Sequence, residues 1–175
     1  MGTALKNIVI KNGIFLGIAM IIFNFTQYTT GVLYTSNTGL SILLWLVGAA
    51  MYAYFISVAV GQYKASNNDQ LTVVDGLKVG AVVGVIAGVL LGIYNVLYTT
   101  VIDPDYYDKV MDLTIDAFSP MIDKMTESQA EEFYDKLVNS KPTTTATFIY
   151  SVIWGTVGGL IIGVIVGLVK KSKNN

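Results

Sequence analysis

The sequence predicts an all-α polytopic membrane protein with four transmembrane helices and an extracytoplasmic amphipathic helical insertion between helices three and four. Apolar residues make up 53% of the 175-residue chain and charged residues only 13%, about half the charged fraction of a soluble domain. Ten of the 12 acidic residues and four of the 11 lysines fall within residues 103–141. The rest of the chain therefore contains uncharged stretches long enough to cross a bilayer.

The first two transmembrane helices are predicted at residues 13–34 and 40–63, because neither range contains a charged side chain. The first run follows Lys6 and Lys11, as the apolar part of a signal peptide would. It is longer than such a segment and lacks a cleavage site of small residues, so we interpret it as a retained helix. The uncharged link at 35–39 is rich in turn-forming residues and predicts a tight hairpin.

The third and fourth transmembrane helices are predicted at residues 79–102 and 145–169. The third ends before Asp103 and Pro104, where proline opposes continuation of a helix. The fourth stops at a group of lysines, Lys170, Lys171 and Lys173. The whole chain, 1–175, is thus interpreted as a single membrane domain.

The distribution of lysines predicts the orientation of the four helices. An even number of crossings places both termini on one side, and lysines favour the cytoplasmic side. The link at 35–39 has none, whereas seven lysines belong to the side of the termini. Both termini are therefore expected in the cytoplasm, with residues 103–141 outside. Aromatic residues, which prefer the membrane interface, agree by gathering toward the outer side: Tyr34, Trp45, Tyr94, Tyr98, Tyr150 and Trp154.

Glycine recurs at every fourth position in the third and fourth predicted helices. Residues four apart share one helix face, and glycines there let two backbones approach closely. Gly158 is expected to widen the second groove. The rows are consistent with packing inside one protomer, with assembly of a homo-oligomer, or with a pore between protomers. Their members are Gly80, Gly84, Gly88 and Gly92, and then Gly155, Gly159, Gly163 and Gly167.

The predicted spans contain no ionisable Asp, Glu, Lys, Arg or His, although transporters coupled to ions usually keep such residues in the membrane. Ion-coupled transport is therefore disfavoured. The amides Asn24, Gln27 and Asn95 are candidates for polar contacts inside the membrane. Two interpretations stay open for them, hydrogen bonds between helices and the lining of a solute site.

The insertion at 104–141 has the pattern of two amphipathic helices. Pro120 is expected to end the first, and residues 126–129 have the form of a capping box at the start of the second. The first carries an acidic stripe, which could lie on the membrane surface, gather a divalent cation or bind an external partner. The spacing and glycine of an EF-hand are absent. The stripe consists of Asp105, Asp108, Asp112 and Asp116.

Several kinds of chemistry are excluded or disfavoured by composition. The chain contains no Cys, His or Arg, which removes thiolate nucleophiles, histidine acid–base catalysis and the guanidinium contacts typical of nucleic-acid binding. No catalytic, metal-binding or cofactor-binding motif is recognisable. We therefore expect no enzyme, no cofactor and no nucleic-acid partner.

The order of features resembles that of the DUF4199 family, small bacterial membrane proteins found chiefly in Bacteroidetes. The resemblance is carried by lysines before the first helix, by the sequences VDGLKVG at 74–80 and YTTVIDPDYYDK at 98–109, by the Met-rich acidic insertion, and by the glycine-rich last helix ending in lysines. It implies a four-helix, multi-pass protein of the bacterial inner membrane and gives no catalytic motif to carry over.

These observations favour a non-enzymatic role in assembly or interaction. The glycine rows would pack the third and fourth helices, and the acidic external segment would recognise a partner. Besides the lipid bilayer, the expected partners are a second copy of the chain or another membrane protein. The alternative is a small oligomeric channel or a solute facilitator.

Overall fold

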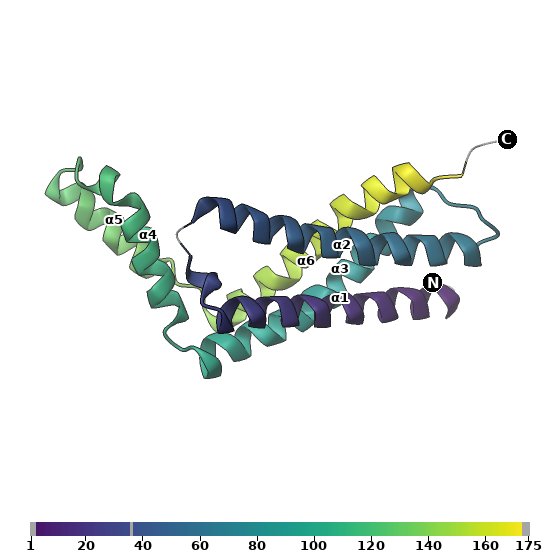
Figure 1. Cartoon of the computed structure of the whole chain (residues 1–175), viewed down its shortest axis with the longest axis horizontal. Coiled ribbons are helices and arrows are strands. Elements are labelled where there is room, and N and C mark those ends of the chain that lie inside the picture. The colour runs from purple at the N-terminus through teal and green to yellow at the C-terminus, as the bar shows by residue number, and fades with distance from the viewer. Residues whose placement is uncertain (1–2, 36, 173–175) are drawn as a thin grey trace.

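The fold is all-α, as predicted, in a computed structural model that describes residues 3–35 and 37–172. Along the chain, two short amphipathic helices come between the third and fourth long helices, and they project from one end of the bundle (Figure 1). In chain order the elements are α1 (Thr3–Thr29), a 3-10 turn (Val32–Tyr34), α2 (Thr38–Ser66), α3 (Val73–Leu97), a π-helical turn (Tyr98–Ile102), α4 (Tyr106–Ile122), α5 (Glu127–Asn139) and α6 (Thr144–Lys170).

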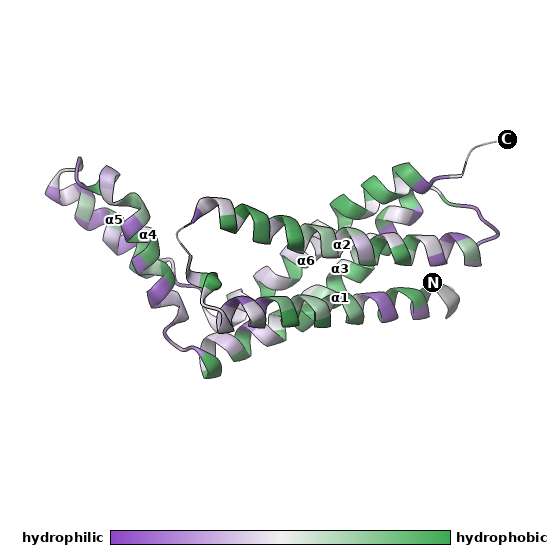
Figure 2. Ribbon diagram, in the orientation of Figure 1, coloured by the Kyte–Doolittle hydropathy of each residue, from purple (hydrophilic) through white to green (hydrophobic). Residues whose placement is uncertain are grey.

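Four of these helices are long and apolar enough to cross a membrane. The candidate spans are Leu5–Thr29, Thr38–Ser66, Val73–Ile102 and Thr144–Lys170. Figure 2 shows a contrast in composition. The long helices are mostly hydrophobic, whereas the hairpin formed by α4 and α5 carries many hydrophilic residues. The chain is therefore a multi-pass membrane protein.

The two ends of the bundle differ. The start of α1, the end of α6 and the loop from α2 to α3 lie at one end, which we name the terminal end. The link from α1 to α2 lies at the other, named the hairpin end because α4 and α5 project from it side by side (Figure 1). α3 and α6 form the most extensive helix pair, and α1 packs against both α3 and α2.

The long helices extend further toward the terminal end than the charge-free runs that predicted them. Lys6 and Lys11 lie within α1, and Lys64 and Lys78 lie within α2 and α3. A lysine can keep its ammonium group in water while its aliphatic stem follows the helix surface. Lys170 is the last residue of α6, and Lys173 lies outside the described residues.

The first helix ends earlier than the predicted 13–34. It stops at Thr29, and Gly31 then takes a left-handed backbone with φ of 70°, which glycine tolerates better than other residues. The hydroxyls of Thr26 and Thr30 donate to main-chain oxygens one turn earlier in the helix. Such local bonds compete with helix continuation and favour an end.

The expectation that Pro120 ends the first external helix is wrong. α4 continues through Pro120 to Ile122. Proline lacks the N–H that would donate to the carbonyl of Asp116 four residues earlier. The Ser119 hydroxyl donates to that carbonyl instead, at 2.8 Å, and the helix continues. The capping box of the second helix is confirmed, because Thr126 and Gln129 bond each other's backbone N–H groups.

The terminal half of the bundle has a close-packed apolar core between α1, α2 and α3. One polar pair enters it, with the Asn12 amide donating to Gln62 at 2.9 Å. At the terminal end, Lys170 donates to the carbonyl of Ser57 on α2, and Lys64 donates to that of Lys170 on α6. The core consists of Val9, Leu16, Ile56, Ala59, Val60, Leu71, Val79, Val83 and Ala87.

Candidate functional site

The two glycine rows face each other across the α3–α6 contact, within one chain. A Cβ atom added to Gly155 would lie 2.6 Å from the carbonyl oxygen of Gly84. One added to Gly163 would lie 2.6 Å from that of Gly76, and the contact of Gly80 with Gly159 is closer still. The two backbones touch without intervening side chains, so this geometry fits the interpretation of packing inside a protomer.

The rest of the α3 row meets larger groups of α6. Gly88 lies against the backbone of Ser151 and Val152, and Gly92 against the ring of Phe148. Gly167, at the end of the α6 row, faces the backbone of Val73. The row on α3 also begins one turn earlier than predicted, at Gly76.

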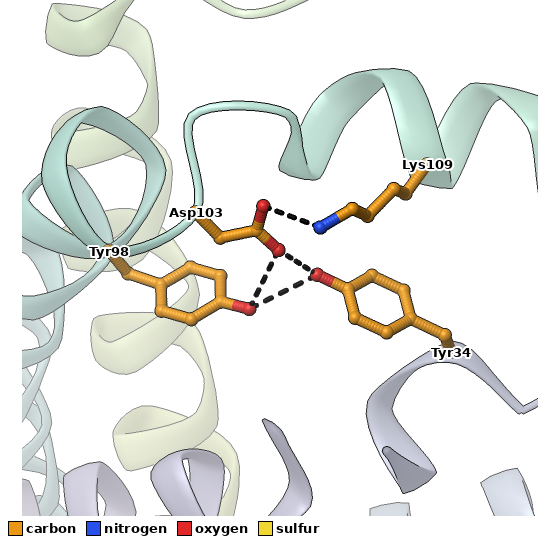
Figure 3. Close-up of polar contacts among 4 residues, drawn as sticks. All are labelled: Tyr34, Tyr98, Asp103 and Lys109. Carbon is orange, nitrogen blue, oxygen red and sulfur yellow. Dashed lines mark hydrogen bonds and ion pairs between the residues drawn. The ribbon is translucent and has the colours of Figure 1, made fainter. Parts of the chain in front are cut away.

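A buried carboxylate lies at the hairpin end, where α3 passes into α4 (Figure 3). Asp103 is 4% exposed, and its Oδ1 atom accepts from Lys109 Nζ at 2.7 Å. Its Oδ2 atom accepts from the hydroxyl of Tyr34 and, at 3.4 Å, from that of Tyr98. The two tyrosine hydroxyls are themselves 3.1 Å apart. We name Tyr34, Tyr98, Asp103 and Lys109 the carboxylate cluster.

Local backbone geometry positions the cluster. The π-helical turn Tyr98–Ile102 ends with the N–H of Asp103 donating to the carbonyl of Tyr98 at 2.8 Å. This bond places the side chains of Tyr98 and Asp103 on the same side of the turn, where they contact each other. Lys109 comes from the first turns of α4, and Tyr34 comes from the link between α1 and α2. The cluster therefore ties three separate segments together at the base of the hairpin.

The charges of the cluster are balanced. Burial raises the pKa of the Asp103 carboxyl, but hydrogen bonds from Lys109 and Tyr34 lower it more, so that the pKa lies below its ordinary value. The hydrogen bond to Asp103 raises the pKa of Lys109. Burial, followed by the bond to Asp103, raises the pKa of Tyr34. At neutral pH the cluster thus holds an ionised pair with protonated Tyr34.

A cavity of about 990 Å³ lies beside the cluster, at the hairpin end of the four long helices. Tyr98 and Tyr106 line it from the hairpin side, and their rings meet edge to face at 5.4 Å. Its other walls come from α1, α2, α3 and α6. The cavity thus occupies the half of the bundle that the apolar core does not fill.

The three predicted intramembrane amides all line this cavity. Asn24 donates to the carbonyl of Met20 in its own helix, at 2.8 Å. Asn95 donates to the hydroxyl of Ser151, at 2.9 Å, and so joins α3 to α6. Gln27 makes no side-chain hydrogen bond within the described residues. The structure thus gives geometry compatible with both interpretations, an interhelical bond at Asn95 and a lining role for all three.

The predicted acidic stripe does not converge on one point. Asp105 precedes the first residue of α4, Asp108 pairs with Lys141, and Asp112 and Asp116 are exposed along the helix. Within 3–35 and 37–172, no group of three or more acidic residues has the arrangement of a metal site. The stripe lies on an exposed face of the chain.

The family model described as "Protein of unknown function (DUF4199)" matches residues 11–172. The chain belongs to the DUF4199 family. The match covers all four candidate spans almost completely, and it confirms the resemblance that the order of sequence features indicated. No curated protein and no solved structure matches the chain significantly.

Sequence reasoning about this DUF4199 protein missed the carboxylate cluster. In the sequence, Asp103 indicates only the end of a helix, and its partners Tyr34 and Lys109 lie 69 residues before it and six after it. A signal existed, because Asp103 is the acidic residue that directly follows an uncharged span. An acidic residue at that boundary is costly to bury without partners, and tyrosine and lysine can supply them.

Two glycines of α1 were also missed. Gly13 and Gly17 lie four residues apart on α1. A Cβ atom added to Gly13 would lie less than 3.0 Å from the side chain of Ile86, and one added to Gly17 less than 3.0 Å from that of Leu90, both on α3. The spacing is the same small-residue signal that predicted the other rows. In contrast, Gly158 does not widen the α3–α6 groove, because it faces Tyr52 of α2.

Proposed function

We propose that this DUF4199 protein has a non-enzymatic role in assembly or interaction, with the α4–α5 hairpin as its recognition surface. The bundle would hold the hairpin at the membrane boundary. By the distribution of lysines, the hairpin would lie outside a bacterial inner membrane, with both termini in the cytoplasm.

The proposal rests on the observation that the hairpin is attached to the bundle at its base while its apolar side chains are left exposed. Neither α4 nor α5 contains a buried residue. Apolar side chains such as Phe118, Met121 and Val138 are 43%, 44% and 51% exposed. A helix pair that buries so little of its apolar surface gains little from its own packing. A surface of this kind favours a partner that covers it.

The base of the hairpin is held by two polar connections. The carboxylate cluster ties α4 to the α1–α2 link and to α3. A second connection runs from the Tyr107 hydroxyl to Thr147 of α6, at 2.6 Å. These bonds fix the hairpin to the bundle without covering its length, which supports a role in presentation.

The electrostatics of the hairpin support a basic partner surface. Asp112, Asp116, Glu131 and Asp135 are exposed along α4 and α5 and take part in no salt bridge within the part of the chain that the structure describes. Complementary charge speeds association and excludes wrong partners more than it adds affinity. The expected partner is another membrane protein or a second copy of this chain.

Site-specific photo-crosslinking tests the proposal. A photoreactive amino acid would replace Asp112 on the hairpin or, as a control, Lys78 at the terminal end, in the protein expressed in its own host. The proposal expects one defined protein adduct from the hairpin position, lost when Asp116, Glu131 and Asp135 are changed to their amides. Equal adducts from both positions, or none from the hairpin, would contradict it.

A solute facilitator is the second candidate, and the cavity is the observation in its favour. Passage through one chain would require a path across the core that contains Leu16, Ile56 and Val83, each 0% exposed. The glycine rows are occupied by the α3–α6 contact, so they offer no sliding surface for a pore between protomers. Solute flux into proteoliposomes that disappears when Asn95 is replaced by leucine would favour this candidate over the first.

A further inference from the structure

We propose that the cavity at the hairpin end binds a neutral lipid, with an aliphatic chain and an uncharged headgroup of hydroxyl and ester groups, as in a diacylglycerol. This ligand site includes Tyr106 and Tyr107 at the base of α4, but it does not depend on the recognition proposed for the exposed length of the hairpin.

The size and position of the cavity fit such a ligand. Its volume of about 990 Å³ lies at the upper end of the range for small-molecule sites. Leu44, Leu91 and Ile162 contribute aliphatic lining, and all three belong to candidate spans. Because the cavity lies within the candidate spans, the molecules next to it would be lipids.

The charge of the lining selects the headgroup. No Asp, Glu or Lys lines the cavity among the described residues. The carboxylate of Asp103, which accepts from the lining residue Tyr98, is already bonded to Lys109 and to two tyrosines. A phosphate or ammonium group inside the cavity would lose its hydration without gaining a counter-charge, which is costly. An uncharged headgroup avoids that cost.

Unpaired polar side chains supply the groups that would recognise it. Gln27, Tyr52 and Tyr94 line the cavity, and their side chains make no hydrogen bond to any described residue. No fully buried side-chain nitrogen or oxygen lacks a partner in the described part of the chain, so the polar atoms of these three side chains are accessible. Hydroxyl and ester oxygens of a headgroup can bond to such groups.

The cavity reaches the lipid-facing surface between α2 and α6. Trp45 of α2 and Trp154 of α6 both line it and are 71% and 72% exposed. Since both belong to candidate spans, their exposed faces lie toward the bilayer. A lipid can therefore enter from the side without crossing the hairpin.

Two glycines line the cavity at positions where no neighbouring helix is in close contact with their backbone. A Cβ added to Gly158 would come no closer than 3.5 Å to Tyr52, and one added to Gly48 no closer than 3.7 Å to Met20. Both residues line the cavity. Larger side chains would fit the backbone at these positions and would occupy the ligand volume instead.

Fluorescence quenching tests the proposal, because both tryptophans of the chain line the cavity. The full-length protein would be placed in phosphatidylcholine vesicles with increasing fractions of a diacylglycerol brominated in mid-chain. Binding predicts a saturable component of quenching at low fraction, in addition to the linear collisional component. Brominated phosphatidylcholine is expected to give the linear component alone.

Gly158→Leu is expected to remove the saturable component and to keep the linear one. Ala49→Leu, on the α2 wall, provides a second filling variant should the first fail to fold. Gly61→Leu is the matched control, since Gly61 does not line the cavity and an added Cβ meets only the flexible end of Lys170, at 3.4 Å. It is expected to retain the wild-type curve.

Three results would overturn the proposal. Purely linear quenching by the brominated diacylglycerol would show that the cavity does not retain it. An unchanged curve in both folded filling variants would place the binding elsewhere. Saturable quenching by brominated phosphatidylcholine of equal strength would remove the selection for a neutral headgroup.

Discussion

The terminal half and the hairpin half of the bundle are held together by different interactions. In the terminal half, apolar side chains of α1, α2 and α3 fill the interior, and the backbones of α3 and α6 touch through Gly80 and Gly159. In the hairpin half, a cavity takes the place of the core, and polar side chains around Asp103 join the elements. The interior is closely packed in the first half and contains a cavity in the second.

The neighbouring residues Gly158 and Gly159 show this difference within a single helix. Gly159 lies against the backbone of α3, so that any side chain there would separate two helices. Gly158 faces the cavity across from Tyr52, where a side chain has room. The same residue type thus permits contact at one position and leaves space at the next.

The largest effect is expected from Gly159→Leu. The leucine would have to displace the backbone of α3, and overpacking against a rigid neighbour costs about 3 kcal/mol, the upper end of the usual range. We expect loss of the folded protein in mild detergent, measured by thermal unfolding and size-exclusion chromatography. Gly158→Leu is the matched control and should fold, and equal losses in the two variants would refute the distinction between the two faces of α6.

A smaller effect is expected in the hairpin half from Asp103→Asn. The change removes the ion pair with Lys109 and weakens the bonds from the tyrosines, at a cost of about 1–2 kcal/mol. Hydrogen exchange should increase at the base of α4 and remain unchanged in the core around Leu16. Asp105→Asn, at an exposed neighbour, should change neither. Faster hydrogen exchange throughout the bundle would mean that the two halves do not open independently of each other.

Acidification should loosen the base of the hairpin. The pKa of Asp103 is lower in the folded protein than in the unfolded chain, so folding favours the ionised form. Its contribution is complete above the ordinary carboxyl pKa and is lost as the pH falls through the lowered value. Proteolysis at the base of α4 should therefore accelerate as the pH falls below the ordinary carboxyl pKa of 3.8 and through the lowered pKa of Asp103. Asp103→Asn should show a flatter profile.

The smallest effect is expected from Ser119→Ala within α4. The change removes the hydroxyl that satisfies the Asp116 carbonyl opposite Pro120, at a cost of about 0.5–1 kcal/mol. Circular dichroism of the full chain would detect partial fraying of the hairpin on heating. Ser128→Ala, in the first turn of α5, is the control and should have no effect beyond measurement error.

The architecture was predictable because it depends on local composition. Runs without charge indicate the spans, and the change to an amphipathic pattern indicates α4 and α5. Pro120 shows where this reasoning stops, since its effect depends on whether the side chain of Ser119 replaces the missing bond. The proline rule describes the backbone alone and does not include this rescue.

The candidate site was less predictable because it depends on contacts between distant segments. The burial of Asp103 requires Tyr34 from another part of the chain, and no spacing in the sequence links the two. Likewise, the glycine spacing identifies the row of α6 that contains Gly159, but it does not show that the adjacent Gly158 faces Tyr52 of α2. The amides Asn24, Gln27 and Asn95 were selected by polarity, and only the fold brings them to one cavity.

The contact between α3 and α6 also has a consequence for biosynthesis. Gly80 and Gly159 are separated by the whole of α4 and α5, so α3 leaves the ribosome well before its partner exists. At about 5–20 residues per second, the interval is on the order of ten seconds. During that time the glycine groove is open to any neighbouring helix with small residues, and a newly made chain must keep it vacant until its own last helix arrives.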